Sequence, residues 1–162
     1  MIRFECDYAE GAAPQLLERL TRTNLEQTPG YAVDGHCQRA RDLIRAACAA
    51  PQAEVEFLVG GTQANQTVIS AALRPYQGAL CAQTGKITPK QVEQFCAVHW
   101  ADPTREHIVQ PGMVYLSQPT ETGLLYTRTE LEGFRAVCDR YGMYLYIDGA
   151  RCGYGLAAPE ND

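Results

Sequence analysis

The sequence of 162 residues lacks the features of a membrane, secreted or nucleic-acid-binding protein. No apolar run approaches the ~20 residues that a helix needs to cross a bilayer. The first residues, "MIRFECDYAEG", contain no apolar stretch like that of a secretory signal. There is no cluster of five or more basic residues, and the net charge is −5. We therefore expect a cytoplasmic protein with no nucleic-acid partner and no membrane partner.

The sequence also lacks cysteine pairs of the kind that bind zinc. Its seven cysteines contain no C-x-x-C pair, their number is odd, and the three histidines are no better placed. We expect no metal site and no disulfide framework. The cysteines are interpreted instead as buried free thiols that pack like small hydrophobic residues.

What is present is the composition of a folded protein, with 46% hydrophobic and 20% charged residues. Four short apolar segments, at about 55–59, 79–83, 113–117 and 143–148, are predicted to be strands. They are apolar nearly throughout and do not alternate with polar residues, which is typical of strands buried on both faces. Because helical segments lie between them, we predict an α/β fold of three layers, α/β/α, with a mostly parallel sheet.

Several signals mark the helices between these strands. Helices are expected over about 14–27, 35–50 and 63–73, the first with Leu16, Leu17 and Leu20 on one face. Thr88 is predicted to cap a fourth helix whose buried face carries Val92, Phe95 and Cys96. Thr129 and Glu132 match a capping box for a fifth, which Gly142 can close in the left-handed conformation.

Two glycines and a threonine, Gly60, Gly61 and Thr62, lie between the first predicted strand and the helix after it. Free backbone amides and the helix dipole attract anions at such a position, and glycine lets a phosphate approach the backbone. The segment has neither the lysine of a P-loop nor the G-x-G-x-x-G of a dinucleotide fold. A phosphate site and a simple tight turn therefore both remain open.

Asp148 ends the last predicted strand, and Arg151 follows three residues later. A D-G turn is one interpretation of "DGAR". The other is a binding edge, where the carboxylate holds a cation or an N–H group and the planar guanidinium holds a carboxylate or phosphate. Ligands of parallel sheets gather at the carboxyl ends of the strands, so "GGTQ", "QPTETG" and "DGARCGYG" are expected to converge on one site.

"GGTQANQ" after a strand, followed by "IDGAR" after a later strand, resembles the large domain of the pyridoxal-phosphate enzymes of aspartate-aminotransferase fold. More narrowly, the chain is similar to the threonine aldolase and β-eliminating lyase family. By this resemblance Gly61 and Thr62 hold the phosphate of pyridoxal 5'-phosphate, and Asp148 pairs with its pyridinium nitrogen. Arg151 binds the carboxylate of the amino-acid substrate.

The same resemblance places Tyr31 and Glu10 near the substrate pocket. It implies a division into an amino-terminal helix and active-site arm, residues 1–34, and a partial cofactor-binding domain, residues 35–162. It implies cleavage of the Cα–Cβ bond of a β-hydroxy amino acid such as threonine or allo-threonine, giving glycine and an aldehyde. A homodimer or a dimer of dimers is expected. A β-eliminating lyase, or a non-catalytic relative that binds only a phosphate ligand or a partner chain, stays an alternative.

The chain departs from the family in two places. The family carries its Schiff-base lysine one strand beyond the aspartate, whereas the lysines here are Lys86 and Lys90, in the middle of the chain. Relatives also have a longer segment where Gly85 meets Lys86, and it includes the residue that stacks on the cofactor. We expect residues to be missing at this join and the catalytic lysine to lie beyond Asp162. Thr120 stands where some threonine aldolases have a histidine, so the catalytic base is unassigned.

Overall fold

The computed structural model describes residues 5–6, 8–82 and 85–159. The chain divides into two compact units, Met1–Phe57 and Leu58–Asp162. The boundary expected at residue 34 stays a prediction, and the helix that follows residue 34 belongs to the first compact unit. Arg41 on that helix donates hydrogen bonds to the carbonyls of Ala32 and Val55, at 2.8 and 3.0 Å.

The first unit contains the helices α1 (Pro14–Thr23) and α2 (Gly35–Ala47). Asp34 caps α2, and its Oδ1 accepts hydrogen bonds from the backbone N–H groups of His36 and Cys37, at 2.8 and 3.0 Å. None of the described residues of this unit is buried. The apolar face predicted for the first helix is exposed, with Leu17 at 53% and Leu20 at 62%.

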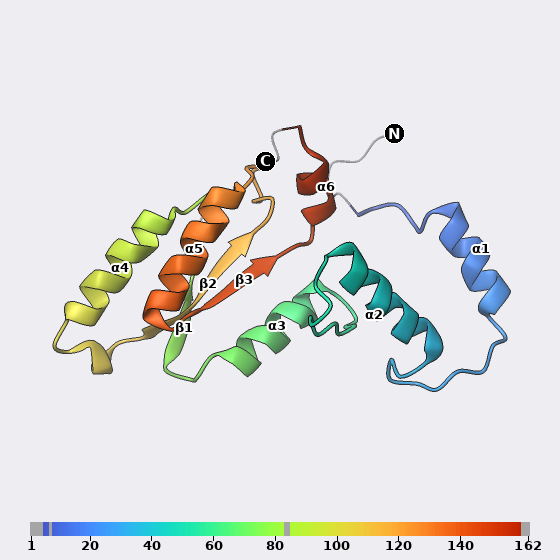
Figure 1. Cartoon of the computed structure of the whole chain (residues 1–162), viewed down its shortest axis with the longest axis horizontal. Helices are drawn as coiled ribbons and strands as arrows, with labels where there is room; N and C mark the ends of the chain where they lie inside the picture. Colours follow the sequence, from blue (N-terminus) through green and yellow to red (C-terminus); the bar gives the residue numbers. More distant parts are fainter. Residues whose placement is uncertain (1–4, 7, 83–84, 160–162) are drawn as a thin grey trace. The chain divides into compact units, whose positions relative to one another are not determined.

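The second unit is built on a sheet of three strands in the order β1-β2-β3, with both pairs parallel. Helix α3 packs on one face, and α4 and α5 lie side by side over the other (Figure 1). The predicted three-layer architecture is confirmed. The elements of this unit are α3 (Gly61–Ala72), β1 (Gln77–Leu80), α4 (Pro89–Ala101), the 3-10 turn η1 (Arg105–His107), β2 (Gln110–Ser117), α5 (Arg128–Tyr141), β3 (Tyr144–Asp148) and α6 (Cys152–Ala157).

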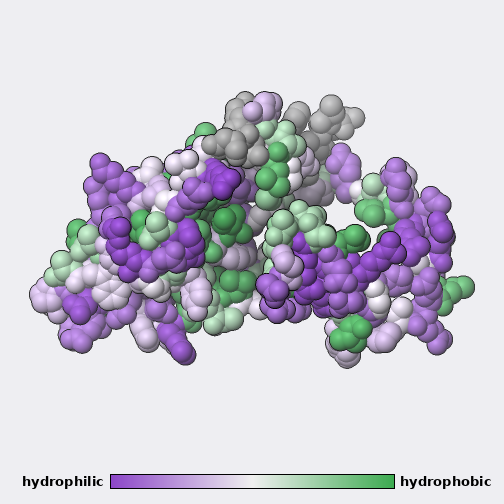
Figure 2. Space-filling model, in the orientation of Figure 1, coloured by the Kyte–Doolittle hydropathy of each residue, from purple (hydrophilic) through white to green (hydrophobic). Residues whose placement is uncertain are grey.

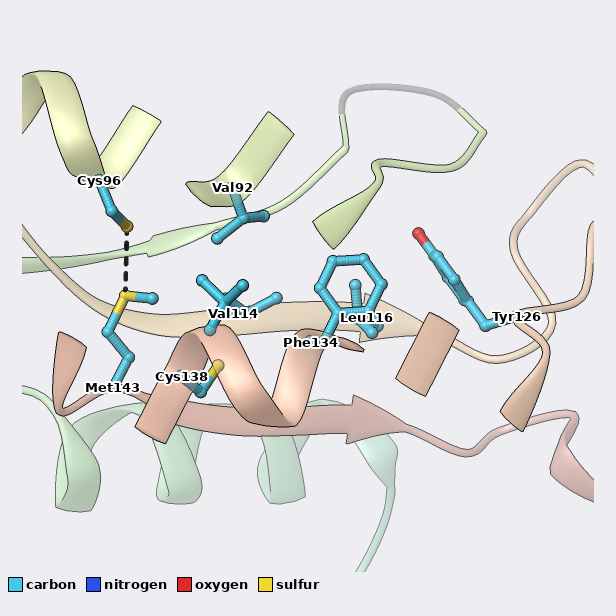
Figure 3. Packing of buried hydrophobic residues seen from close by; sticks show 9 residues of the cluster. Val92, Cys96, Val114, Leu116, Tyr126, Phe134, Cys138 and Met143 are labelled. Atoms are coloured by element: carbon cyan, nitrogen blue, oxygen red, sulfur yellow. Dashed lines mark hydrogen bonds between the residues drawn. The ribbon is translucent and has the colours of Figure 1, made fainter. Parts of the chain in front are cut away.

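The core lies between the sheet and the pair α4 and α5 (Figure 3). Val114 and Leu116, two residues apart on β2, point toward this pair, as the period of a strand requires. Phe134 of α5 is fully buried against them, and its ring meets Tyr126 edge to face at 5.6 Å. Cys96 and Cys138 are buried as predicted. The other members of the core are Val92, Val137 and Met143.

Other predictions about burial were wrong. Phe95, expected on the buried face of α4, is 50% exposed and stacks on His99. Cys48 and Cys81 are exposed and not buried. No helix among the described residues is long and apolar enough to cross a membrane.

The strand predicted at 55–59 is not present. Residues 55–59 have no regular secondary structure, and Phe57, Leu58 and Val59 are 40%, 46% and 92% exposed. An extended segment needs a neighbouring strand to bond its N–H and C=O groups. In the described part of the chain no strand pairs with this segment, so its apolar sequence alone does not make it a strand.

The capping signals are confirmed for α4 and corrected for α5. Thr88 and Gln91 form a capping box at the start of α4. For α5 the box is Thr127 with Glu130, not Thr129 with Glu132. Both pairs have the same spacing, but Glu130 also binds Lys86 at 2.6 Å, which favours the earlier start. Gly142 ends α5 in the left-handed conformation, with φ of 66°, as predicted.

Candidate functional site

The carboxylate of Asp148 lies at the carboxyl end of β3, where the sequence places it. Its Oδ2 accepts a hydrogen bond from the hydroxyl of Tyr115 at 2.6 Å and one from Nδ2 of Asn65 at 2.8 Å. Tyr115 is on β2 and Asn65 is in α3, so two elements meet at one carboxylate oxygen.

Strand register explains why these side chains meet. Tyr115 pairs with Tyr146 across β2 and β3, and their rings are 5.3 Å apart. Asp148 lies two residues after Tyr146 and therefore on the same face of the sheet. Tyr115 is its diagonal neighbour across the strands, within reach of a long side chain. Helix α3 covers this face and supplies Asn65, whose Oδ1 accepts from the hydroxyl of Tyr146 at 2.7 Å.

Asp148 is held as an anion. Burial acts to raise its pKa, but the hydrogen bonds from Tyr115 and Asn65, a backbone N–H from Ala150 and the charge of Arg151 outweigh burial, so the pKa is below its ordinary value. The pKa of Tyr115 is raised by burial and by its hydrogen bond to this carboxylate. The hydroxyl therefore keeps its proton and donates it to Asp148 as a hydrogen bond.

The amino end of α3 is open to a ligand. Gly60 is the N-cap residue, Gly61 begins the helix, and no side chain caps it. A Cβ added at either glycine would meet nothing within 4 Å, and Thr62 is exposed. Asn65 is only one turn further along, so the helix that presents these amides also contacts Asp148. Such an amino end, with the positive end of the helix dipole, suits an anion.

Arg151 lies just past Asp148, and its charge contributes to lowering the pKa of that carboxyl. Its Nη1 is 3.3 Å from both carboxylate oxygens of Glu121. The Glu121 side chain is 76% exposed, so this ion pair faces water and another carboxylate can compete for the guanidinium.

A cavity of about 210 Å³ opens at the carboxyl ends of β1 and β2. Tyr115 lines it and also binds Asp148, so the cavity and the carboxylate are adjacent. Thr120 lines it as well and is buried, with its Oγ1 accepting from the N–H of Leu124 at 3.0 Å. The remaining lining residues are Cys81, Ala82, Gly85, Leu116, Ser117, Glu121, Thr122 and Tyr126.

The structure brings together part of the predicted site. Asp148 and Arg151 are neighbours at one edge, and the helix that begins with Gly61 and Thr62 reaches Asp148 through Asn65. Glu10 and Tyr31 belong to the first unit, where both are exposed, and their roles stay predictions.

Sequence reasoning missed Asn65, Tyr115 and Tyr146. Asn65 lies inside the quoted "GGTQANQ", one helical turn after Gly61, and Tyr146 lies two residues before Asp148. Helical and strand periods place both on the side of the site. Tyr115 could not be found this way, because its position depends on the register of β2 against β3.

Comparison with known proteins supports one family. No family model matches the chain. A low specificity L-threonine aldolase from Pseudomonas aeruginosa is 27% identical over 176 residues, covering 92% of this chain and 49% of that protein. A second low specificity L-threonine aldolase, from a Pseudomonas species, is 26% identical and covers the same fractions of the two chains. The chain spans about half the length of the curated relatives it matches.

A solved structure gives the same result. The threonine aldolase of Leishmania major superposes with a TM-score of 0.89 and 35% identity, covering 96% of this chain and 52% of that one. The predicted resemblance to threonine aldolases and the predicted fold are confirmed. The match to the Pseudomonas aeruginosa protein extends over 176 residues, more than the 162 of this chain, so the alignment includes residues that this chain lacks.

Proposed function

We propose that this chain is part of a pyridoxal-phosphate-dependent lyase that cleaves β-hydroxy amino acids such as threonine to glycine and an aldehyde. The observation that supports this most is the ionised Asp148 carboxylate, held by two donors at the sheet edge beside an uncapped, glycine-lined helix start. The names of the matched proteins, all threonine aldolases, point to the same reaction.

The residues present fit this cofactor. An anionic carboxylate such as Asp148 favours the protonated form of a ring nitrogen, and the open amides at Gly61 and Thr62 suit a phosphate. When bound, the cofactor supplies an electron sink for the charge left at Cα. Asp148 would keep the proton on the ring nitrogen, and Gly61 and Thr62 would bind the phosphate.

Arg151 would orient the substrate. Its guanidinium already binds a carboxylate, that of Glu121, and can bind the α-carboxylate of an amino acid in the same way. With the amino group held at the cofactor, fixing the α-carboxylate as well would fix the directions of the other bonds at Cα, and so favour the breaking of one of them. Tyr31 and Glu10 are proposed to lie near the substrate.

The cofactor-bearing lysine is proposed to lie outside this chain. The amine of Lys86 is engaged by Glu130 and by the carbonyl of Leu125, each at 2.6 Å, and stands over the ring of Tyr126. Lys90 is in the first turn of α4. A homodimer or dimer of dimers located in the cytoplasm is part of the same proposal. The alternatives are β-elimination, or a phosphate-binding role without catalysis.

Titration of the purified chain with pyridoxal 5'-phosphate tests the proposal. We expect a saturable change in the visible absorbance. Asp148→Asn should lower the affinity for the cofactor by about tenfold or more, because the neutral amide cannot hold the ring proton in the same way. Asp139→Asn, on the exposed side of α5, is the matched control and should bind like the unchanged chain. Absence of any saturable change would refute the cofactor site. A full-length parent should release an aldehyde from threonine.

A further inference from the structure

The side-chain donors to Asp148 share one oxygen, and the backbone N–H of Ala150 is a further donor to this carboxylate. Tyr115 and Asn65 both donate to one oxygen, Oδ2, from a strand and from a helix. The two donors are themselves linked, since Nδ2 of Asn65 lies 3.0 Å from the Tyr115 hydroxyl. Donors from two directions on one oxygen fix the rotation of the carboxylate about its Cβ–Cγ bond.

Tyr146 fixes the orientation of Asn65. Its hydroxyl lies 2.7 Å from Oδ1 of Asn65 and donates to it, so the amide must turn its Nδ2 toward Asp148. The flipped amide would place its oxygen 2.8 Å from the carboxylate, acceptor against acceptor. The order of donation therefore runs from Tyr146 to Asn65 to Asp148, with no choice of direction left open.

We propose that Tyr115 and Asn65 are positioning residues that hold the Asp148 carboxylate ionised and in one rotational position, in which it pairs with the ring N–H of the cofactor. This inference rests on the proposed function for the identity of the ligand. The arrangement of donors on Oδ2 is independent of it.

Packing alone does not require this arrangement. Tyr115 and Tyr146 already pack their rings against each other, tilted by 54° with centroids 5.3 Å apart, which a pair of phenylalanines would do equally well. Even partial burial of two hydroxyls and an amide costs free energy unless every donor finds a partner. Here the partners form one connected set that ends on the carboxylate, so the polar groups serve Asp148 and not the packing of the sheet.

The first arm of the test needs no cofactor. The pKa of the Asp148 side chain is measured by ¹³C NMR in the 162-residue chain. Tyr115→Phe and Asn65→Ala should each raise this pKa toward its ordinary value, because each removes a donor to the charged form. Tyr144→Phe is the control: it removes the hydroxyl of an exposed tyrosine on β3, the strand that ends at Asp148, and should leave the pKa of Asp148 unchanged. An unchanged Asp148 pKa in both Tyr115→Phe and Asn65→Ala would overturn the proposal.

The second arm adds pyridoxal 5'-phosphate. Tyr115→Phe should weaken binding by about tenfold, the typical effect of one hydrogen bond to a charged group. It should also change the ¹⁵N shift of the cofactor's ring nitrogen, a signal that a purely structural role would leave unmoved. If the unchanged chain does not bind the cofactor but the first arm succeeds, the proposed function fails and the positioning of Asp148 stands. Normal cofactor binding and ¹⁵N shift in Tyr115→Phe would overturn the positioning role.

Discussion

The two compact units differ in what stabilises them. In Leu58–Asp162, apolar side chains from two helices and the sheet close into a core. In Met1–Phe57, the described leucines of α1 are more than half exposed, and the tertiary contacts include polar ones, such as those of Arg41 to two backbone carbonyls. Exposed apolar residues lie among polar ones on the visible surface (Figure 2). An amphipathic helix is therefore not by itself evidence of a core, because its partner surface must also be present.

Core truncation should give the largest contrast between the units. Phe134→Ala should lower the free energy of unfolding of the second unit by about 3–5 kcal/mol, because a large fully buried ring is lost. Leu17→Ala on α1 should change stability by less than about 0.5 kcal/mol. Urea unfolding followed by circular dichroism measures both. Equal effects would mean that α1 is buried in solution.

Helix capping gives a smaller contrast inside the second unit. Thr127→Ala should cost about 1 kcal/mol, because its hydroxyl caps α5. Thr129→Ala, two residues later inside the same helix, should cost little or nothing, since alanine has the higher helix propensity. The measurement is again the urea midpoint. A larger loss in Thr129→Ala would restore the capping box first predicted from the sequence.

These cases indicate which parts of the fold could be predicted. The strands predicted at 113–117 and 143–148 are present as β2 and β3, and both find parallel neighbours and helices to pack on within Leu58–Asp162. The segment 55–59 has an equally apolar sequence but no strand beside it among the described residues. Local sequence thus predicts the tendency of a segment, and tertiary pairing decides the outcome.

In the candidate site, too, local sequence predicted some residues and tertiary pairing decided the others. Asp148 and Arg151 could be predicted because a short motif after a strand carries them. Tyr115 could not, since only the parallel register of two strands separated by a helix makes it the diagonal neighbour of Asp148. A sequence motif therefore named the charged groups, and the residues that position them required the structure.

The smallest effect that we predict is a local loss of helix capping in the first unit at acidic pH. The hydrogen bonds from Cys37, followed by the one from the N–H of His36, lower the pKa of Asp34 from 3.8 to about 2. Because the folded pKa is depressed, the capping of α2 is fully present above pH 3.8 and is lost as the pH falls toward 2. The amide NMR signals of His36 and Cys37 should report this transition. Asp34→Asn keeps a good capping residue that does not titrate, so the transition should vanish while the helix remains. A transition that persists in Asp34→Asn would show that another group governs the acid response of α2.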